Sequence, residues 1–214
     1  MPDVELHREP EGLTLVGDGM SLRGDFTRLL PRLKPGTVQR ELLVKAAKVK
    51  GVDAPVAVDA TAGLGEDSLL LAAAGFTVYM YERDEVIFAL LEDALDRAAQ
   101  VPQLAEIVRR MHLTQGDSVQ ALAHLDFLPD VVVLDPMFPM RQKSAVSKKK
   151  MQLFQMLEAP CTDEEALLQA AIDANPRKIV VKRPPKGPYL AGRKPSHSVA
   201  GKAVRFDVIS LPRM

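Results

Sequence analysis

The sequence predicts an α/β fold with a doubly wound, mostly parallel sheet, and three observations support this class. From residue 54 onward, short apolar runs typical of buried strands alternate with segments of helical spacing. Such alternation is typical of parallel strands joined by right-handed helical crossovers. The last apolar stretch has no helix before it, which suits an antiparallel strand at the sheet edge. The length of 214 residues fits one domain of this class.

The predicted elements follow one another in regular order. Strands are expected over residues 55–59, 77–82, 112–115, 130–134, 178–181 and 203–211. Helices are expected over about residues 67–74, 84–100, 102–111, 118–124, 149–157 and 163–174. A loop rich in Pro and Gly is expected over residues 184–201.

The first quarter of the chain is predicted to be an extension of this core. Apolar runs interrupted by Gly predict a β-hairpin over residues 4–26. Thr37 is placed to cap a helix that runs to about Lys50, with apolar side chains along one side. We therefore divide the chain into residues 1–50, a hairpin and helix extension, and residues 51–214, the main domain.

Composition excludes several classes of protein. The 28 basic and 28 acidic residues balance, so the chain as a whole carries no charge that would favour a polyanion. Cys161 is the only cysteine, which excludes an internal disulfide, and the four histidines show no metal-ligand spacing, so no metal is expected. The N-terminus lacks an apolar signal segment and no apolar run reaches membrane-spanning length, so we expect a cytoplasmic protein without a membrane partner.

The stretch from Ala54 to Ser68 is the centre of the predicted site. Asp59 ends a short buried strand, and Gly63 and Gly65 follow before a helix begins. Glycines allow a sharp turn and a close approach of a ligand, which would face the free N–H groups of the helix. Ser68 stands where a dinucleotide fingerprint would have a third glycine. An ordinary tight turn between strand and helix is the alternative interpretation.

Acidic residues also follow other predicted strands. Because the carboxyl ends of parallel strands meet at one edge, Asp59, Glu82, Asp117 and Asp135 should converge on one crevice. Glu82, 17 residues after Gly65, is placed to accept both hydroxyls of a ribose. NAD and S-adenosylmethionine both carry a ribose, so Glu82 alone does not discriminate between them.

The residues beside these acids suggest an adenine site. Arg83 could lie along the adenine ring, and Asp117 with Ser118 could accept the adenine amino group. A plain helix cap explains Asp117 and Ser118 equally well.

The segment Asp135-Pro136-Met137-Phe138 carries the predicted chemistry. The carboxylate of Asp135 and the carbonyl of Pro136 can accept the N–H groups of an exocyclic amine and hold its nitrogen in line for methyl transfer. Phe138 can stack on a flat base. A strand ended by proline is the structural alternative.

Two basic segments flank this chemistry. Residues 141–150 hold five basic residues and no acid, and residues 177–205 hold nine basic residues and no acid. Clusters of this kind beside a base-handling site suggest phosphate contacts, although most charged runs are simply solvated. The predicted RNA-binding residues are Arg141, Lys143, Lys148, Lys149, Lys182, Arg183, Lys186, Arg193 and Lys194.

These motifs resemble known families. The order D-x-x-x-G-x-G at residues 59–65 resembles the first motif of class I S-adenosylmethionine-dependent methyltransferases, whose fold is Rossmann-like. The chain as a whole is similar to the ribosomal RNA small subunit methyltransferase J family through VDATAGLGEDSLLLA, YERDEVIFALLEDAL, KIVVKRP, RFDVI and, most specifically, LDPMFP with the basic QKSA run after it.

The resemblance implies methylation of the 2-amino group of a guanine in 16S rRNA, with S-adenosylmethionine as cofactor and 16S rRNA or the small ribosomal subunit as partner. The cofactor contacts that it implies are Glu66, Asp67, Glu82, Arg83, Asp117, Ser118 and Asp135. Two alternatives stay open from the residues alone: methylation of another amine, on tRNA, a protein glutamine or a small molecule, and an RNA-binding protein that has lost catalysis. An NAD-dependent oxidoreductase is the weakest interpretation, because Ser68 breaks the dinucleotide fingerprint.

Overall fold

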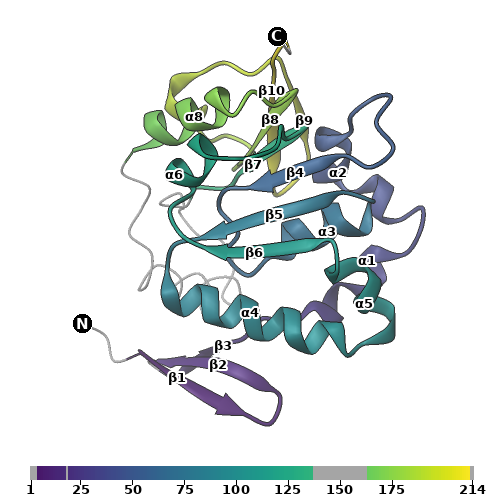
Figure 1. Cartoon of the computed structure of the whole chain (residues 1–214), viewed down its shortest axis with the longest axis vertical. Coiled ribbons are helices and arrows are strands. Elements are labelled where there is room, and N and C mark those ends of the chain that lie inside the picture. The colour runs from purple at the N-terminus through teal and green to yellow at the C-terminus, as the bar shows by residue number, and fades with distance from the viewer. Residues whose placement is uncertain (1–3, 18, 137–162, 213–214) are drawn as a thin grey trace.

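A seven-stranded sheet forms the centre of the computed structural model, which describes residues 4–17, 19–136 and 163–212 (Figure 1). Its strands are β4 (Val56–Asp59), β5 (Thr77–Glu82), β6 (Met111–Gln115), β7 (Val131–Leu134), β8 (Lys178–Arg183), β9 (His197–Ala200) and β10 (Arg205–Ser210). They lie in the order β6-β5-β4-β7-β8-β10-β9. The five strands from β6 to β8 pair in parallel, and β10 is antiparallel to both of its neighbours. The predicted mostly parallel sheet is therefore confirmed.

The far edge of the sheet differs from the prediction. The last strand, β10, is antiparallel as expected, but β9 lies outside it, within the stretch that was expected to be only a loop. Strand β9 is four residues long and mostly exposed, so it lacks the apolar run that marks a strand in sequence. Its pairing with β10, from His197 opposite Val208 to Ala200 opposite Arg205, comes from the tertiary fold.

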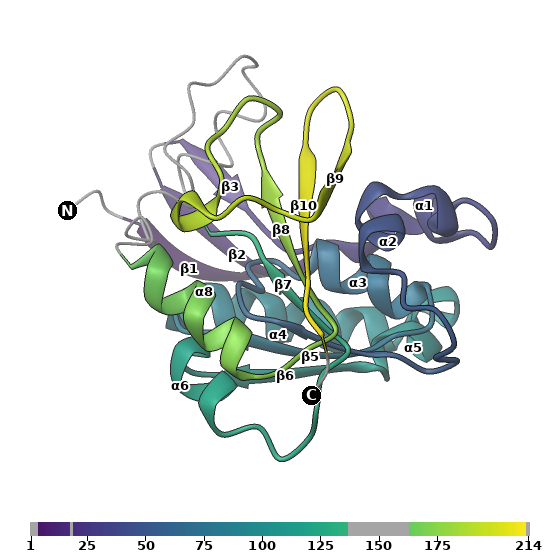
Figure 2. The same ribbon diagram turned by 90° about the horizontal axis from the view of Figure 1, so that it is seen from above.

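Helices cover both faces of the sheet, as Figure 2 shows from above. One face carries α2 (Leu42–Ala47), α3 (Glu66–Ala73), α4 (Glu85–Ala99) and α5 (Pro102–Val108); the other carries α6 (Ser118–Ala123) and α8 (Glu164–Asp173). Alternate strand residues face opposite sides, so Val131 and Val133 join the first core and Val132 and Leu134 the second. All four are buried, as expected for a central parallel strand.

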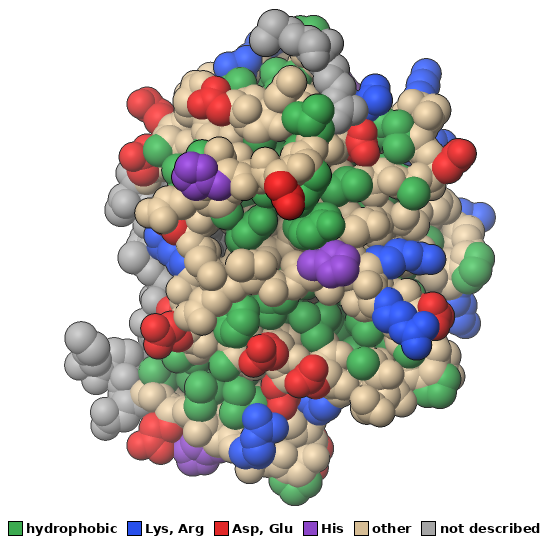
Figure 3. Space-filling view, viewed as in Figure 1, with side chains coloured by type: hydrophobic (Ala, Val, Ile, Leu, Met, Phe, Trp, Pro, Cys, Tyr) green, Lys and Arg blue, Asp and Glu red, His purple; other side chains and the backbone are tan. Residues whose placement is uncertain are grey.

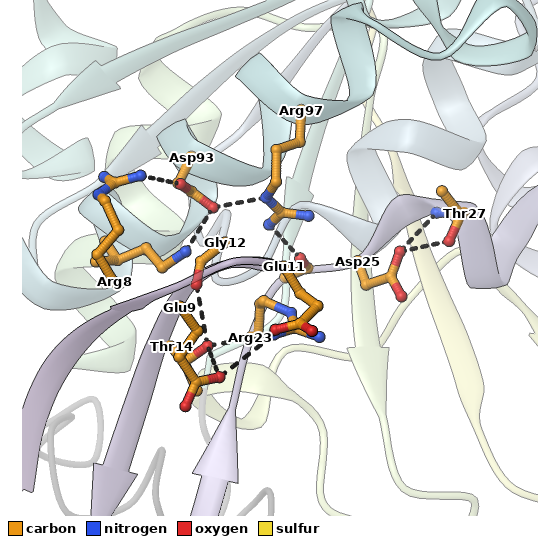
Figure 4. A network of polar contacts seen from close by, with 12 residues as sticks. Arg8, Glu9, Glu11, Gly12, Thr14, Arg23, Asp25, Thr27, Asp93 and Arg97 are labelled. Atoms are coloured by element: carbon orange, nitrogen blue, oxygen red, sulfur yellow. Dashed lines mark hydrogen bonds and ion pairs between the residues drawn. The ribbon is translucent and has the colours of Figure 1, made fainter.

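The N-terminal region forms a second, small sheet. It contains three strands, β1 (Val4–Glu9), β2 (Gly12–Gly17) and β3 (Met20–Leu22), where a two-stranded hairpin was predicted. Leu15 and Leu22 pack against Leu90 of α4. Asp93 of the same helix accepts hydrogen bonds from the backbone of Leu13 and from two arginines, which fastens the small sheet to α4 (Figure 4).

The segment between the two sheets is built of short helical turns. It contains η1 (Phe26–Leu29), α1 (Leu30–Leu33), η2 (Val38–Arg40) and α2. The single helix predicted from Thr37 to Lys50 is wrong, because Glu41 adopts an extended backbone conformation between η2 and α2, and the Thr37 side chain makes no capping bond. Phe26, Val38 and Leu43 belong to the same hydrophobic core as the sheet. The boundary at residue 50 stays a prediction.

Candidate functional site

Three of the four predicted acids lie together where β4, β5 and β7 end. Asp59 is the last residue of β4, Glu82 the last of β5, and Asp135 directly follows β7. The loop after β4 joins them: the Asp135 N–H donates to Thr61 Oγ1 at 2.6 Å, and the Gly63 N–H donates to Glu82 Oε2 at 3.0 Å. The loop is thus held between two strand ends.

The two glycines of this loop have different roles. Both have a positive φ, +53° at Gly63 and +72° at Gly65, which favours glycine. A Cβ added at Gly63 would meet nothing within 4 Å, so its backbone is open to a ligand. A Cβ added at Gly65 would lie 2.7 Å from Leu91 Cδ1. The positive φ alone favours glycine at Gly63, whereas a side chain at Gly65 would also press on Leu91 of α4.

Asp59 supports the loop from beneath. It is 2% exposed, and its carboxylate accepts hydrogen bonds from Ser68 Oγ at 2.6 Å and from the Thr61 N–H at 3.1 Å. Burial raises the pKa of Asp59 to about 6, although the Ser68 hydroxyl opposes the rise. Ser68, which replaces a third glycine, is therefore a partner of Asp59 inside the site.

Glu82 presents an organised carboxylate. It is 4% exposed, and its oxygens accept the N–H groups of Gly63 and Asp84 at 3.0 and 2.9 Å. Burial raises the pKa of Glu82, and these two hydrogen bonds oppose the rise. A carboxylate oxygen has more than one lone pair, so each can accept a further hydroxyl. Arg83, next in the chain, is exposed.

Asp117 and Ser118 lie beyond the end of β6. Asp117 is exposed and caps α6, because its Oδ1 accepts the N–H groups of Val119 and Gln120 at 2.8 and 3.4 Å. The Gly116 N–H donates to the Glu82 carbonyl at 2.9 Å, which sets this turn beside the end of β5. The helix-cap interpretation is therefore correct for Asp117, and a role in binding adenine stays a proposal.

Asp135 is joined to α3 through a lysine on β8. Lys182 Nζ lies 2.7 Å from Asp67 Oδ2 and 2.9 Å from Asp135 Oδ2. Desolvation opposes the charge on Lys182, but the two carboxylates outweigh it and raise its pKa. Desolvation raises the pKa of Asp135, and Lys182 limits that rise. Glu66, the neighbour of Asp67 in the first turn of α3, is exposed.

Sequence reasoning placed Lys182 among the RNA contacts and missed its pairing with Asp135. The signal that could have found this pairing is that the two residues come at the same height on neighbouring strands. Leu134 pairs with Val181, so Asp135 and Lys182 come next at the same end of the sheet. Strand order was needed to use this signal, because residues 135 and 182 are far apart in the chain.

The other predicted basic residues, Lys182 apart, divide into three groups. Arg183 is 1% exposed and pairs with Glu164 at 3.2 Å, so it has no surface to offer a phosphate and we exclude it from the RNA contacts. Lys186, Arg193 and Lys194 are exposed on the loop after β8. On the face shown in Figure 3, acidic and basic side chains are interspersed. Phe138, Arg141, Lys143, Lys148 and Lys149 lie outside the described residues.

The described residues show neither a metal-binding cluster nor a membrane-spanning helix. Within residues 4–17, 19–136 and 163–212, no group of three His, Cys, Asp or Glu side chains could hold a metal ion. No helix in these ranges is long and apolar enough to cross a membrane.

Comparison with known proteins agrees with this geometry. The family model described as "Putative SAM-dependent methyltransferase" matches residues 6–210. A crystal structure of a SAM-dependent methyltransferase from Neisseria gonorrhoeae is similar with a TM-score of 0.78 and 33% sequence identity, and the match covers 98% of this chain and 83% of that one.

Two sequence relatives carry the same name, ribosomal RNA small subunit methyltransferase J. The protein from Chromohalobacter salexigens is 42% identical over 96% of this chain and 84% of its own length. The protein from Thioalkalivibrio sulfidiphilus is 46% identical over 93% of this chain and 84% of its own length. The chain therefore belongs to the ribosomal RNA small subunit methyltransferase J family of S-adenosylmethionine-dependent methyltransferases.

Proposed function

We propose that this enzyme transfers a methyl group from S-adenosylmethionine to the exocyclic 2-amino group of a guanine in 16S rRNA. The observation that carries the proposal is the placement of Asp135, which follows β7, is paired with Lys182 and precedes Pro136. The names of the relatives support ribosomal RNA of the small subunit as the substrate. Because small subunits are assembled in the cytoplasm, we place the enzyme there.

The cofactor of the family fits the residues at the ends of β4, β5 and β6. The open backbone at Gly63 and the first turn of α3, with Glu66 and Asp67, would hold the methionine part. The spare lone pairs of Glu82 would accept the ribose hydroxyls. Five further residues belong to the proposed cofactor set: Asp59 and Gly65 through the loop that they shape, and Arg83 and the pair Asp117–Ser118 beside the adenine.

Asp135 and Pro136 would handle the amine. The bound cofactor supplies an electrophilic methyl group, and a guanine amine is a weak nucleophile because its lone pair is delocalised into the ring. The Asp135 carboxylate and the Pro136 carbonyl would each accept one N–H of the amine, which orients its nitrogen and favours the positive charge that develops on it. Asp135, whose pKa is raised by desolvation, is also placed to take the proton that the nitrogen loses.

The RNA would be held by the loops around this centre. Lys186, Arg193 and Lys194 are exposed at the carboxyl end of β8, where phosphates of the substrate could reach them. The same proposal extends to Arg141, Lys143, Lys148 and Lys149, and Phe138 is proposed to stack on the target base. Lys182 is better suited to Asp135 than to a phosphate, because its ammonium already contacts two carboxylates.

The test is a methyl-transfer assay with nucleoside mass spectrometry. The purified protein is incubated with labelled S-adenosylmethionine and, separately, with unmodified small subunits, naked 16S rRNA, bulk tRNA and a protein extract. We expect N2-methylguanosine in the ribosomal RNA alone. Asp135→Asn should lower the rate by about 10²-fold or more while cofactor binding, measured by calorimetry, persists. Asp53→Asn, at an exposed turn far from these groups in the fold, is the matched control.

Two outcomes would contradict the proposal. Full activity of Asp135→Asn would show that the Asp135 carboxylate is not needed for methyl transfer. Label in tRNA or protein would show that the enzyme methylates an amine other than that of a guanine in 16S rRNA.

A further inference from the structure

An aromatic ring stands exposed on the loop after β8. Tyr189 is 40% exposed, and few other large apolar side chains among the described residues are exposed. The Arg205 guanidinium lies against the ring, with its central carbon 5.2 Å from the ring centroid. Leu190, next in the chain, is 2% exposed and anchors the loop in the second core. The ring is thus fixed on one side and open on the other.

Arg205 is held in place by its own hydrogen bonds. Its Nε and Nη2 donate to the two carboxylate oxygens of Asp207, each at 2.8 Å. Its Nη1 donates to the Pro185 carbonyl at 2.9 Å and its Nη2 to the Gly187 carbonyl at 3.2 Å. The side chain is only 13% exposed, so it is poorly placed for a phosphate. Its function in the fold is to fasten the loop and to support the ring of Tyr189.

This ring lies at the same end of the sheet as Asp135. Arg205 pairs with Arg183, the last residue of β8, and β8 lies between β7 and β10. Two strand spacings, about 10 Å, therefore separate the strand that leads to Asp135 from the strand that begins at Arg205. The same loop carries the exposed Lys186, together with the two basic residues at positions 193 and 194.

We propose that Tyr189, supported by Arg205, stacks on an unpaired base of the RNA close to the nucleotide that is methylated; this rests on the proposed function. An exposed aromatic ring among basic side chains is typical of surfaces that bind single-stranded nucleic acid. Any base has a flat face, so stacking would grip the strand without reading its sequence, while the neighbouring cations contact phosphates. A ring fixed before binding loses little conformational freedom when the base arrives.

The first test is direct binding of a fluorescent, single-stranded oligoadenylate to the full-length protein. Tyr189→Ala should weaken binding about tenfold, and Tyr189→Leu, which keeps apolar bulk, should weaken it to a similar degree. Tyr189→Phe keeps the ring and should retain the affinity. Leu128→Ala removes another exposed apolar side chain, 57% exposed, and should bind as the parent protein does. Equal affinity of the parent, Tyr189→Ala and Tyr189→Leu proteins would overturn the proposal.

The salt dependence of the same binding separates stacking from charge. Lys194→Gln should reduce the slope of log affinity against log salt by about 0.7, because one phosphate contact is lost. Tyr189→Ala should leave that slope unchanged. A reduced slope for Tyr189→Ala would mean that the ring acts only by positioning the cations, and would overturn the stacking assignment.

Methylation kinetics distinguish this proposal from the proposed function. Tyr189→Ala should raise the KM for naked 16S rRNA and for small subunits about equally, with cofactor affinity unchanged. A defect confined to whole subunits would assign the ring to a ribosomal protein and overturn the proposal. If the parent protein methylates no RNA but binds the oligonucleotide through Tyr189, the proposed function fails and the stacking surface stands.

Discussion

Asp59 and Asp93 are both buried carboxylates that fasten a loop to the core, but their surroundings shift their pKa values in opposite directions. Burial raises the pKa of Asp59 to about 6, and the nearby carboxylates of Asp67 and Asp135 add to the rise. The two hydrogen bonds that Asp59 accepts come from uncharged groups, so they oppose the rise only in part. Burial would also raise the pKa of Asp93, but hydrogen bonds from Arg97 and the Leu13 N–H, with Arg8, lower it.

The contrast separates the candidate site from the attachment of the small sheet. At the end of the sheet, Lys182 contacts Asp67 and Asp135, and these two carboxylates lie near the buried Asp59, so burial and like charge raise the pKa of Asp59. Buried groups whose pKa values are shifted in this way are typical of active sites. Beside α4, one carboxylate meets two guanidinium groups and a backbone N–H, which favours the folded state. The same residue type thus has a raised pKa at the candidate site and a lowered pKa where it attaches the small sheet.

Replacement of Lys182 should produce the largest effect. Lys182→Gln removes the ammonium that lies 2.9 Å from Asp135 and that opposes the rise in its pKa more than Arg183 does, so the Asp135 carboxyl should be protonated at higher pH. We expect kcat to fall on the order of 10²-fold and the acid limb of the pH–rate profile to move to higher pH. Lys186→Gln, on the exposed loop, controls for loss of a positive charge. A lower kcat with an unmoved acid limb would show that Lys182 only supports the fold.

Replacement of Asp59 should change how the stability of the protein depends on pH. A native pKa above the ordinary 3.8 means that the folded state binds the extra proton, so wild-type stability declines as pH rises from about 4 to about 6. The side chain introduced by Asp59→Asn cannot ionise, whereas its amide oxygen can still accept the Thr61 N–H and its amide NH2 can donate to Ser68 Oγ. The stability of the variant relative to wild type should therefore increase by about 3 kcal/mol over that range. Urea unfolding across this pH range measures the difference. Asp53→Asn, at an exposed turn, is the control, and a constant difference for Asp59→Asn would contradict the assignment.

Replacement of Asp93 should destabilise the protein by about 2 kcal/mol, because the part-buried N–H of Leu13 and the half-buried Arg97 lose an acceptor. The lowered pKa of Asp93 means that its contribution is present above pH 3.8 and is lost as the pH falls below that value. Asp96→Ala, on the exposed side of the same helix, is the matched control. Thermal unfolding of Asp93→Ala and Asp96→Ala at neutral pH measures the effect, and equal stabilities would show that apolar packing alone holds the small sheet.

The helices and strands that could be predicted are those marked by their own residues. The five parallel strands, α4 behind its Asp84 cap and α8 behind its Asp163 cap follow from short apolar runs and capping residues, and all lie within a few residues of the prediction. Strands β1 and β9 lie beyond the predicted strands and are mostly exposed, so neither has the apolar run that marks a strand, and each forms by pairing with the strand that follows it in the chain, β2 or β10. The helix after Thr37 failed because packing of short turns against the core prevailed over helix propensity.

Within the site, residue types were predictable and pairings were not. Glu82 and Asp135 were found because acids after strands converge in any parallel sheet. The separate roles of Gly63 and Gly65 depend on Leu91, which reaches the loop from α4. The pairing of Lys182 with Asp135 depends on which strand lies beside β8, and that of Arg183 with Glu164 depends on where α8 packs; no local pattern encodes either.

Replacement of a residue in the outer part of the network in Figure 4 should change stability least. It therefore tests whether the buried Asp93 alone attaches the small sheet. Arg23 lies 3.5 Å from Glu9 and 3.7 Å from Glu11, and these glutamate side chains are 42% and 64% exposed. Water screens such pairs and both partners lose side-chain freedom, so Glu11→Gln should change stability by less than about 0.5 kcal/mol. Urea unfolding of Glu11→Gln at low and high salt is the measurement. An effect as large as that of Asp93→Ala would mean that the whole network acts as one unit, and the attachment of the small sheet could no longer be assigned to the buried carboxylate.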